Sequence, residues 1–188
     1  MVASSILPLA VAIPLFTACR PDPVQWNVEI AAATLKSGRL DLIGINQFQK
    51  AEYWDGLSVD DYWQRSDSVP GNIYRLTFDF TEGKINLVDA RGVERTGVAN
   101  DGSKVVTIPR EHPIWRRWFE NNAAGLVAIG RFPGGRSGPA GGADPRKRLL
   151  PLFKQCWDSK DRTLRLEIQD NGPVVVTPPA RKAPRDCF

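Results

Sequence analysis

The side chains that could carry chemistry in this sequence are three cysteines, one histidine and a few neighbouring acids. His112 is a solitary imidazole, whereas nucleophilic triads and multi-histidine zinc sites need an imidazole held by further positioned groups. Four acids stand in pairs, Glu52 with Asp55 and Asp60 with Asp61. Such pairs resemble glycosidase carboxylates, but adjacent acids on a helix are usually solvated charges. We therefore expect no enzyme activity, no metal and no cofactor.

One cysteine follows an apolar amino-terminal segment. Residues 1–18 carry no charged side chain and contain two prolines. They suit an export signal better than a spanning helix, which needs about 20 apolar residues. Small residues precede Cys19, as in the bacterial lipobox, whose cysteine is lipidated on its sulfur and becomes the first residue of the mature chain after cleavage. We predict a leader at 1–18 and a lipidated linker at 19–23; a buried amino-terminal segment with an incidental cysteine is the alternative.

The other two cysteines lie near the carboxyl end. If Cys19 carries lipid, Cys156 and Cys187 remain as a pair for a disulfide in an oxidising compartment. The bridge would close a loop of about thirty residues and tie the Pro-rich basic tail at 179–188 to the body. Two unpaired thiols are the alternative, because the sequence does not fix the distance between their Cα atoms.

Length and composition indicate one globular domain. The 188 residues include 25 Lys and Arg against 21 Asp and Glu, and the net charge is +4. Hydrophobic residues at 42% exclude a wholly disordered chain, and 16 glycines with 15 prolines favour turns and strands over long helices. Basic residues between 131 and 148 have no base-stacking motif beside them, so we expect no nucleic-acid partner.

Alternation of apolar and polar residues predicts short strands throughout residues 24–178. The expected strands cover 24–31, 40–49, 73–80, 84–90, 105–109, 125–132, 149–153, 163–169 and 173–178. Ser37 and Gly38 are the predicted turn between the first two, and 170–172 form a tight turn in the last hairpin. Frequent turns and one-sided alternation predict an all-β fold with two packed sheets, a β-sandwich, and one or two short helices.

Two amphipathic stretches interrupt the strands. Ser58 is predicted to cap one short helix, and Pro113 begins the other. Four tryptophans are expected in the core: Trp26, Trp115, Trp118 and Trp157. Four further aromatic residues stand among acids and are predicted either to form an exposed recognition patch or to join the core: Tyr53, Trp54, Tyr62 and Trp63.

The order of these segments resembles the outer-membrane lipoprotein of type VI secretion systems, the TssJ or SciN family. The matching pieces are Cys19 after the leader, the Gly-Arg turn at 38–39, the Gln-hydrophobic pair at 47–48, the aromatic acidic segment at 52–64, the strand at 126–131 and the last strand pair at 164–176. The resemblance implies a transthyretin-like β-sandwich fastened by lipid to the periplasmic face of the outer membrane.

The resemblance also implies that the protein acts through contact surfaces. Such a lipoprotein recruits the periplasmic domain of an inner-membrane component, TssM, and anchors the envelope-spanning complex. The family's partner-binding loop corresponds here to Thr34, Leu35, Lys36, Ser37, Gly38 and Arg39. The alternative function is a periplasmic immunity protein that blocks a toxic enzyme with its aromatic acidic segment or its Gly-rich loop at 133–145. Neither function involves a small-molecule substrate.

Overall fold

The computed structural model describes residues 22–32, 37–65, 74–91, 93, 95–137, 143–184 and 187. The predicted leader, Cys19, Thr34, Leu35 and Lys36 lie outside these residues, as do residues 138–142 of the Gly-rich loop. In the part of the chain that is described, no helix has the length and apolar character needed to cross a membrane.

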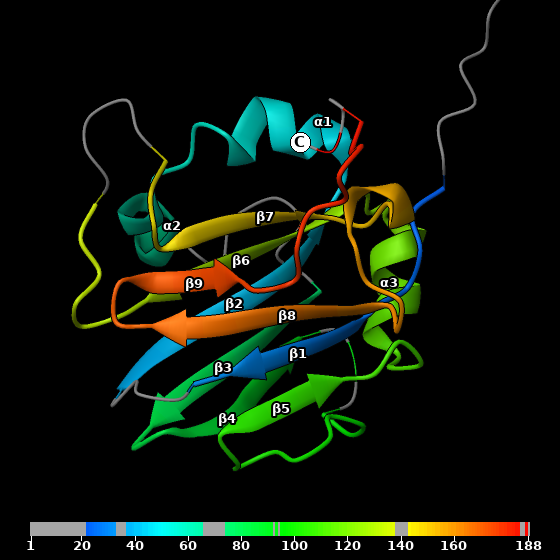
Figure 1. Cartoon of the computed structure of the whole chain (residues 1–188). Coiled ribbons are helices and arrows are strands. Elements are labelled where there is room, and N and C mark those ends of the chain that lie inside the picture. The colour runs from blue at the N-terminus through cyan, green and yellow to red at the C-terminus, as the bar shows by residue number, and fades with distance from the viewer. Residues whose placement is uncertain are drawn as a thin grey trace, which may run out of the picture.

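The described strands form two sheets that face each other (Figure 1). The four-stranded sheet has the order β5 (Val105–Ile108), β1 (Asn27–Ala31), β8 (Thr163–Gln169) and β9 (Gly172–Val175). The five-stranded sheet has the order β4 (Lys84–Arg91), β3 (Arg75–Thr81), β2 (Ser37–Ile45), β6 (Gly125–Arg131) and β7 (Lys147–Pro151). β1 pairs with β8 in parallel, whereas the remaining pairs of these named strands are antiparallel. The predicted two-sheet β-sandwich is confirmed.

The main hydrophobic core lies between the two sheets. Leu40 and Leu42 of β2 belong to the same buried cluster as Val28 and Ile30 of β1. This alternation along each strand is the pattern from which the strands were predicted. The last hairpin is also confirmed, with Gln169 paired to Gly172, whose φ of 143° favours glycine.

Helix α3 (Ile114–Glu120) packs beside one end of the sandwich (Figure 1) and buries two of the predicted core tryptophans. Trp118 donates its indole N–H to the carbonyl of Tyr74 at 2.8 Å. A Cβ on Gly44 would lie only 2.4 Å from Cγ of Trp118, so the glycine in the middle of β2 lets the indole lie against the strand. Trp26 is buried as predicted, whereas Trp157 is only half-buried.

The outer face of the five-stranded sheet is covered by the π-helical turn η1 (Lys50–Trp54) and the helix α2 (Val59–Arg65). A further helical turn, α1 (Gln47–Gln49), leads from the end of β2 into η1 and has no buried residue. The strand predicted at 40–49 therefore ends earlier, at Ile45. The reason is a capping box: the Asn46 side chain accepts from the Gln49 N–H at 2.8 Å, and Oε1 of Gln49 accepts from the Asn46 N–H at 3.1 Å.

The turn predicted at Ser37 and Gly38 is wrong, because both residues are the first positions of β2. Gly38 pairs with Phe80 of β3. A Cβ at Gly38 would lie 2.6 Å from the ring of Phe132. Glycine at this position therefore admits the Phe132 ring and does not serve to reverse the chain.

The Ser58 cap of α2 is confirmed, since the Asp61 N–H donates to Oγ of Ser58 at 3.0 Å. The four aromatic residues of η1 and α2 that were predicted either to form an exposed patch or to join the core do not form an exposed patch. Trp54 and Tyr62 are both 0% exposed, and Tyr53 and Trp63 are half-buried beside them. They pack on β2 and β6 in a second core, because the outer face of the sheet is itself apolar.

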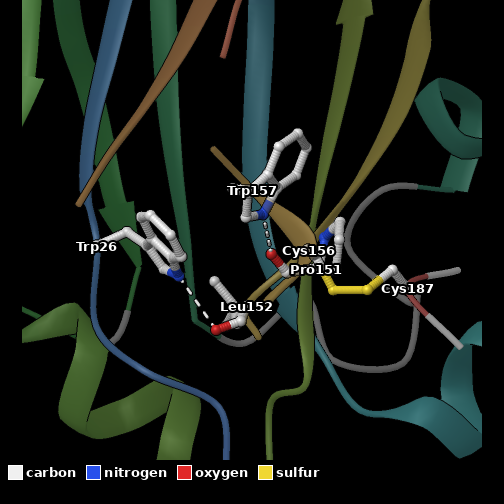
Figure 2. The surroundings of a disulfide bond; sticks show 6 residues. All are labelled: Trp26, Pro151, Leu152, Cys156, Trp157 and Cys187. Atoms are coloured by element: carbon white, nitrogen blue, oxygen red, sulfur yellow. Dashed lines mark hydrogen bonds between the residues drawn. A yellow bond between two sulfur atoms is a disulfide. The ribbon is translucent and has the colours of Figure 1, made fainter. Parts of the chain in front are cut away.

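The carboxyl-terminal tail is joined to the body by the predicted cysteine pair (Figure 2). Cys156 ends the 3-10 turn η2 (Lys154–Cys156), and its Cα lies 5.6 Å from that of Cys187. The Ala180 N–H donates to the Cys156 carbonyl at 3.0 Å, and the indole of Trp157 donates to the Pro151 carbonyl at 2.7 Å. With a sequence separation of 31, the bridge is worth about 3–4 kcal/mol in the chain-entropy model.

His112 precedes α3 and is 2% exposed. Its Nδ1 accepts from the N–H of Ile114 at 3.2 Å, which requires that nitrogen to be unprotonated. Burial lowers the pKa of His112 from its ordinary 6.5. The native state therefore binds fewer protons at this site than the unfolded chain does as the pH falls below about 6.5.

The free energy of unfolding should accordingly be highest above pH 6.5 and decrease as the pH falls from there toward the lowered pKa of His112. Urea unfolding of the wild type and of His112→Gln at several pH values in this window measures the effect. The glutamine variant should be less stable at neutral pH but should lose less stability on acidification. Parallel pH profiles for the two proteins would contradict the assignment.

Candidate functional site

The predicted partner residues Ser37, Gly38 and Arg39 line a groove at the start of β2. The groove has a volume of about 450 Å³. Its other walls come from α2, the end of β3 and the segment that leaves β6: Trp63, Asp79, Phe80, Thr81, Arg131, Phe132 and Pro133. Thus half of the predicted loop contributes to a concave surface, while Thr34, Leu35 and Lys36 lie outside the described residues.

The charges of the groove are set by strand register. Arg39 lies opposite Asp79 of β3 on one side and opposite Arg131 of β6 on the other. Its Nε donates to Oδ1 of Asp79 at 2.6 Å, and its Nη2 donates to Oδ2 at 3.0 Å. This two-point contact raises the pKa of Arg39 above its ordinary value and holds the guanidinium in one orientation. The row therefore presents one acid and two cations, with a net positive charge.

Two buried phenylalanines of the main core, Phe80 and Phe132, also line the groove. The rings of Phe80 and Phe132 meet edge to face with centroids 6.2 Å apart. Phe132 can lie flat on the sheet because Gly38 and Gly130 lack side chains; a Cβ on Gly130 would lie 2.0 Å from the ring. A groove with a row of charges beside the half-buried Trp63 suits an extended protein segment that carries an acid.

Helix α2, which brings Trp63 to the groove, is positioned by a buried polar contact. Asp41 is 0% exposed, and its Oδ2 accepts a hydrogen bond from the Tyr62 hydroxyl. Nη1 of Arg75 lies 3.4 Å from the same oxygen. Burial raises the pKa of Asp41, opposed by the hydroxyl groups of Tyr62 and Thr77 and by the charge of Arg75. A carboxylate so deeply buried needs its donors in place.

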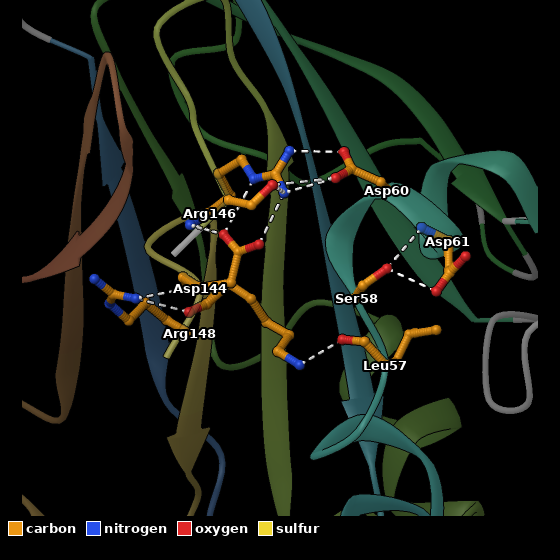
Figure 3. Close-up of polar contacts among 9 residues, drawn as sticks. Leu57, Ser58, Asp60, Asp61, Asp144, Arg146 and Arg148 are labelled. Atoms are coloured by element: carbon orange, nitrogen blue, oxygen red, sulfur yellow. Dashed lines mark hydrogen bonds and ion pairs between the residues drawn. The ribbon is translucent and has the colours of Figure 1, made fainter. Parts of the chain in front are cut away.

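A second polar contact joins α2 to the start of β7 (Figure 3). The Arg146 guanidinium donates to both oxygens of Asp60, at 2.8 and 3.1 Å, and to Oδ2 of Asp144 at 2.8 Å. These contacts lower the pKa of the Asp60 carboxyl. Asp60 is thus an ion-pair partner as well as a surface acid.

The neighbouring Lys147 also makes structural hydrogen bonds. Its ammonium group donates to the carbonyls of Trp54, the last residue of η1, and of Leu57, in the loop before α2, both at 2.7 Å. Burial lowers the pKa of this lysine. Two members of the basic cluster between 131 and 148 are therefore structural, and Arg131 remains exposed at the groove.

The remaining candidates are spread through the fold. Glu52 and Asp55 lie on or just after η1, on the exposed side, and His112 lies beside α3. Within the described residues, no group of three or more His, Cys, Asp and Glu side chains is arranged to hold a metal ion. Sequence reasoning missed Asp79 and Arg131 as groove residues, because only the pairing of three strands brings them beside Arg39.

Comparisons with known proteins give little beyond this geometry. No protein-family model matches the chain, and no curated protein matches it. Among solved structures, the chain is similar to the T6SS lipoprotein TssJ1 from Pseudomonas aeruginosa. The two share 12% sequence identity over 86% of this chain and 99% of that one, with a TM-score of 0.42. An identity and a score this low support no conclusion about function.

The contact that positions α2 can be tested by removing one hydroxyl group. Tyr62→Phe should lower the free energy of unfolding by about 1.5–3 kcal/mol, because the buried Asp41 loses a donor. Tyr53→Phe, a change of the same kind at a half-buried neighbour, should change it by less than about 0.5 kcal/mol. Urea unfolding measures both. Equal effects of the two substitutions would show that the Tyr62 hydroxyl does not hold the helix.

Proposed function

We propose that this protein is a periplasmic lipoprotein, held on the outer membrane by acyl chains on Cys19, that binds an inner-membrane secretion component. In this proposal the groove at the start of β2, together with Thr34, Leu35 and Lys36, contacts the periplasmic domain of a TssM-like protein. The contact anchors the envelope-spanning complex of a type VI secretion system.

Three features of the chain support export and anchoring. Residues 1–18 are uncharged and stop at Cys19. Cys156 and Cys187 are joined in the structure, and disulfides persist in oxidising compartments such as the periplasm. That pairing also leaves Cys19 as the one cysteine of the sequence outside the bridge, which suits its proposed use as the acylated residue.

The main support for the proposal is that two concave surfaces lie at opposite ends of β2. Asp22, where the described chain begins, lines a hollow together with Asn46 and Gln47, which follow the end of β2. The groove lies at the strand's beginning. Nine residues in extended conformation span about 26–30 Å. A chain tethered just before Asp22 therefore presents the groove on the side away from its tether, where a second protein can reach it.

Charge reversal in the groove tests the partner contact. Arg131→Glu should weaken binding to the periplasmic domain of the inner-membrane secretion component about tenfold or more, because it reverses an exposed charge at the groove. Arg116→Glu is the matched control, since it makes the same charge change at an exposed site on α3. Calorimetric titration of the detergent-solubilised lipoprotein measures both.

Equal binding by the two variants would exclude the groove as the contact surface. Tight binding to an envelope toxin, with none to the secretion component, would favour the immunity function instead.

Cys19→Ala tests the anchor. Without the thiol no thioether to lipid can form, so the protein should move from the outer-membrane fraction to the soluble periplasmic fraction or stay unprocessed. Cys187→Ala, which removes a cysteine from the disulfide, should leave the protein in the outer-membrane fraction. Fractionation followed by mass measurement of the mature chain detects both. Outer-membrane retention of Cys19→Ala would refute lipid anchoring at this residue.

A further inference from the structure

The end of the sandwich where the described chain begins carries an unusual aromatic surface. A hollow of about 560 Å³ opens there between the start of the chain, α1 and the end of α3. We call the surface around it, formed by Asp22, Phe48, Phe119 and Phe153, the amino-terminal face. Three of the ten residues that line the hollow are phenylalanines, and they come from segments far apart in the sequence.

Phe48 is the most exposed of the large apolar side chains in the described chain, at 68%. The exposure of Phe48 does not result from a loosely held backbone. The capping box between Asn46 and Gln49 encloses it, and the backbone continues directly into η1. The phenyl ring is therefore held outward on a fixed turn, where burial of its apolar area is forgone in the protein alone.

The opposite wall of the hollow is equally fixed. Phe153 is 6% exposed and Ala124 is 9% exposed, and both belong to the buried cluster that surrounds the disulfide between Cys156 and Cys187. Exposed cations flank this wall. Lys154 follows Phe153 directly. Arg181 and Lys182 follow Ala180, whose backbone N–H donates a hydrogen bond to the Cys156 carbonyl.

We propose that the amino-terminal face rests on the lipid bilayer, with the Phe48 ring inserted among the headgroups and upper acyl chains. This inference rests on the proposed acylation of Cys19. Three peptide units separate Cys19 from Asp22, so an acylated Cys19 lies at most about 11 Å from the rim of the hollow. Interfacial contacts bury an apolar group about 5–10 Å into the boundary between headgroups and acyl chains, so a face held within about 11 Å of the acylated residue can reach it.

The chemistry of the face suits a lipid surface. The Phe48 ring on one wall of the hollow and the exposed Lys154, Arg181 and Lys182 beside the opposite wall are the two kinds of group that interfacial membrane contacts use, in which a ring enters the boundary and cations meet phosphate groups. A single ring is too small to hold a protein on a membrane. The contact therefore orients the sandwich, and the acyl chains retain it.

Site-specific labelling tests the contact. The protein carrying Phe48→Cys is expressed with its leader, purified in detergent, labelled with the environment-sensitive dye NBD and reconstituted in vesicles of phosphatidylethanolamine and phosphatidylglycerol. Val105→Cys is the matched control: Val105 is also an exposed apolar residue, at 39%, but it pairs with Ala31 at the other end of β1. Mass measurement under non-reducing conditions verifies that the native disulfide is retained.

Lipids with a nitroxide on the upper acyl chain should quench the dye at position 48 about threefold more than the dye at position 105. Equal quenching, in protein that floats with the vesicles, would overturn the membrane contact and leave the anchor intact. Protein that does not float with vesicles would overturn the acylation of Cys19 and the inference with it. Shielding of position 48 only when the secretion component is added would assign the face to a protein contact instead.

Discussion

Burial of β2 on both faces is the constraint on which the rest of the molecule depends. From Leu40 to Ile45 every residue of this strand is buried. One face packs on the opposite sheet, and the other requires a second cover, which α2 and η1 provide. Asp41 falls within the covered stretch, so the cover must also supply a donor, the Tyr62 hydroxyl. The place of α2, and with it one wall of the groove, follows from both requirements.

Strands with one buried face could be predicted from the sequence. β8 has the predicted bounds, and the hairpin to β9 closes at the predicted glycine. β2 could not be delimited in this way, because a strand buried on both faces has no alternation to follow. Its true end was readable from Asn46 and Gln49, which form a capping box with Asn in place of the commoner Ser or Thr.

The groove could be predicted only in part. The resemblance to a known family indicated Ser37, Gly38 and Arg39, but the acid and the second cation beside them come from β3 and β6 through register. The local sequence also predicts a turn at Gly38. The local sequence does not distinguish a glycine that makes room for a distant ring, here that of Phe132, from a glycine that reverses the chain. In the basic cluster, Arg146 and Lys147 look like a surface for anions until their partners on α2 and η1 are known.

The position of β1 has a consequence for how the molecule is made. β1 is the first strand of the described residues, yet it lies inside its sheet, between β5 and β8. Its parallel neighbour β8 is synthesised almost last, so a chain still emerging from the ribosome has no partner for that side of β1. Pairing over such sequence distances is slow, and folding of this sheet is therefore delayed until nearly the whole polypeptide is available.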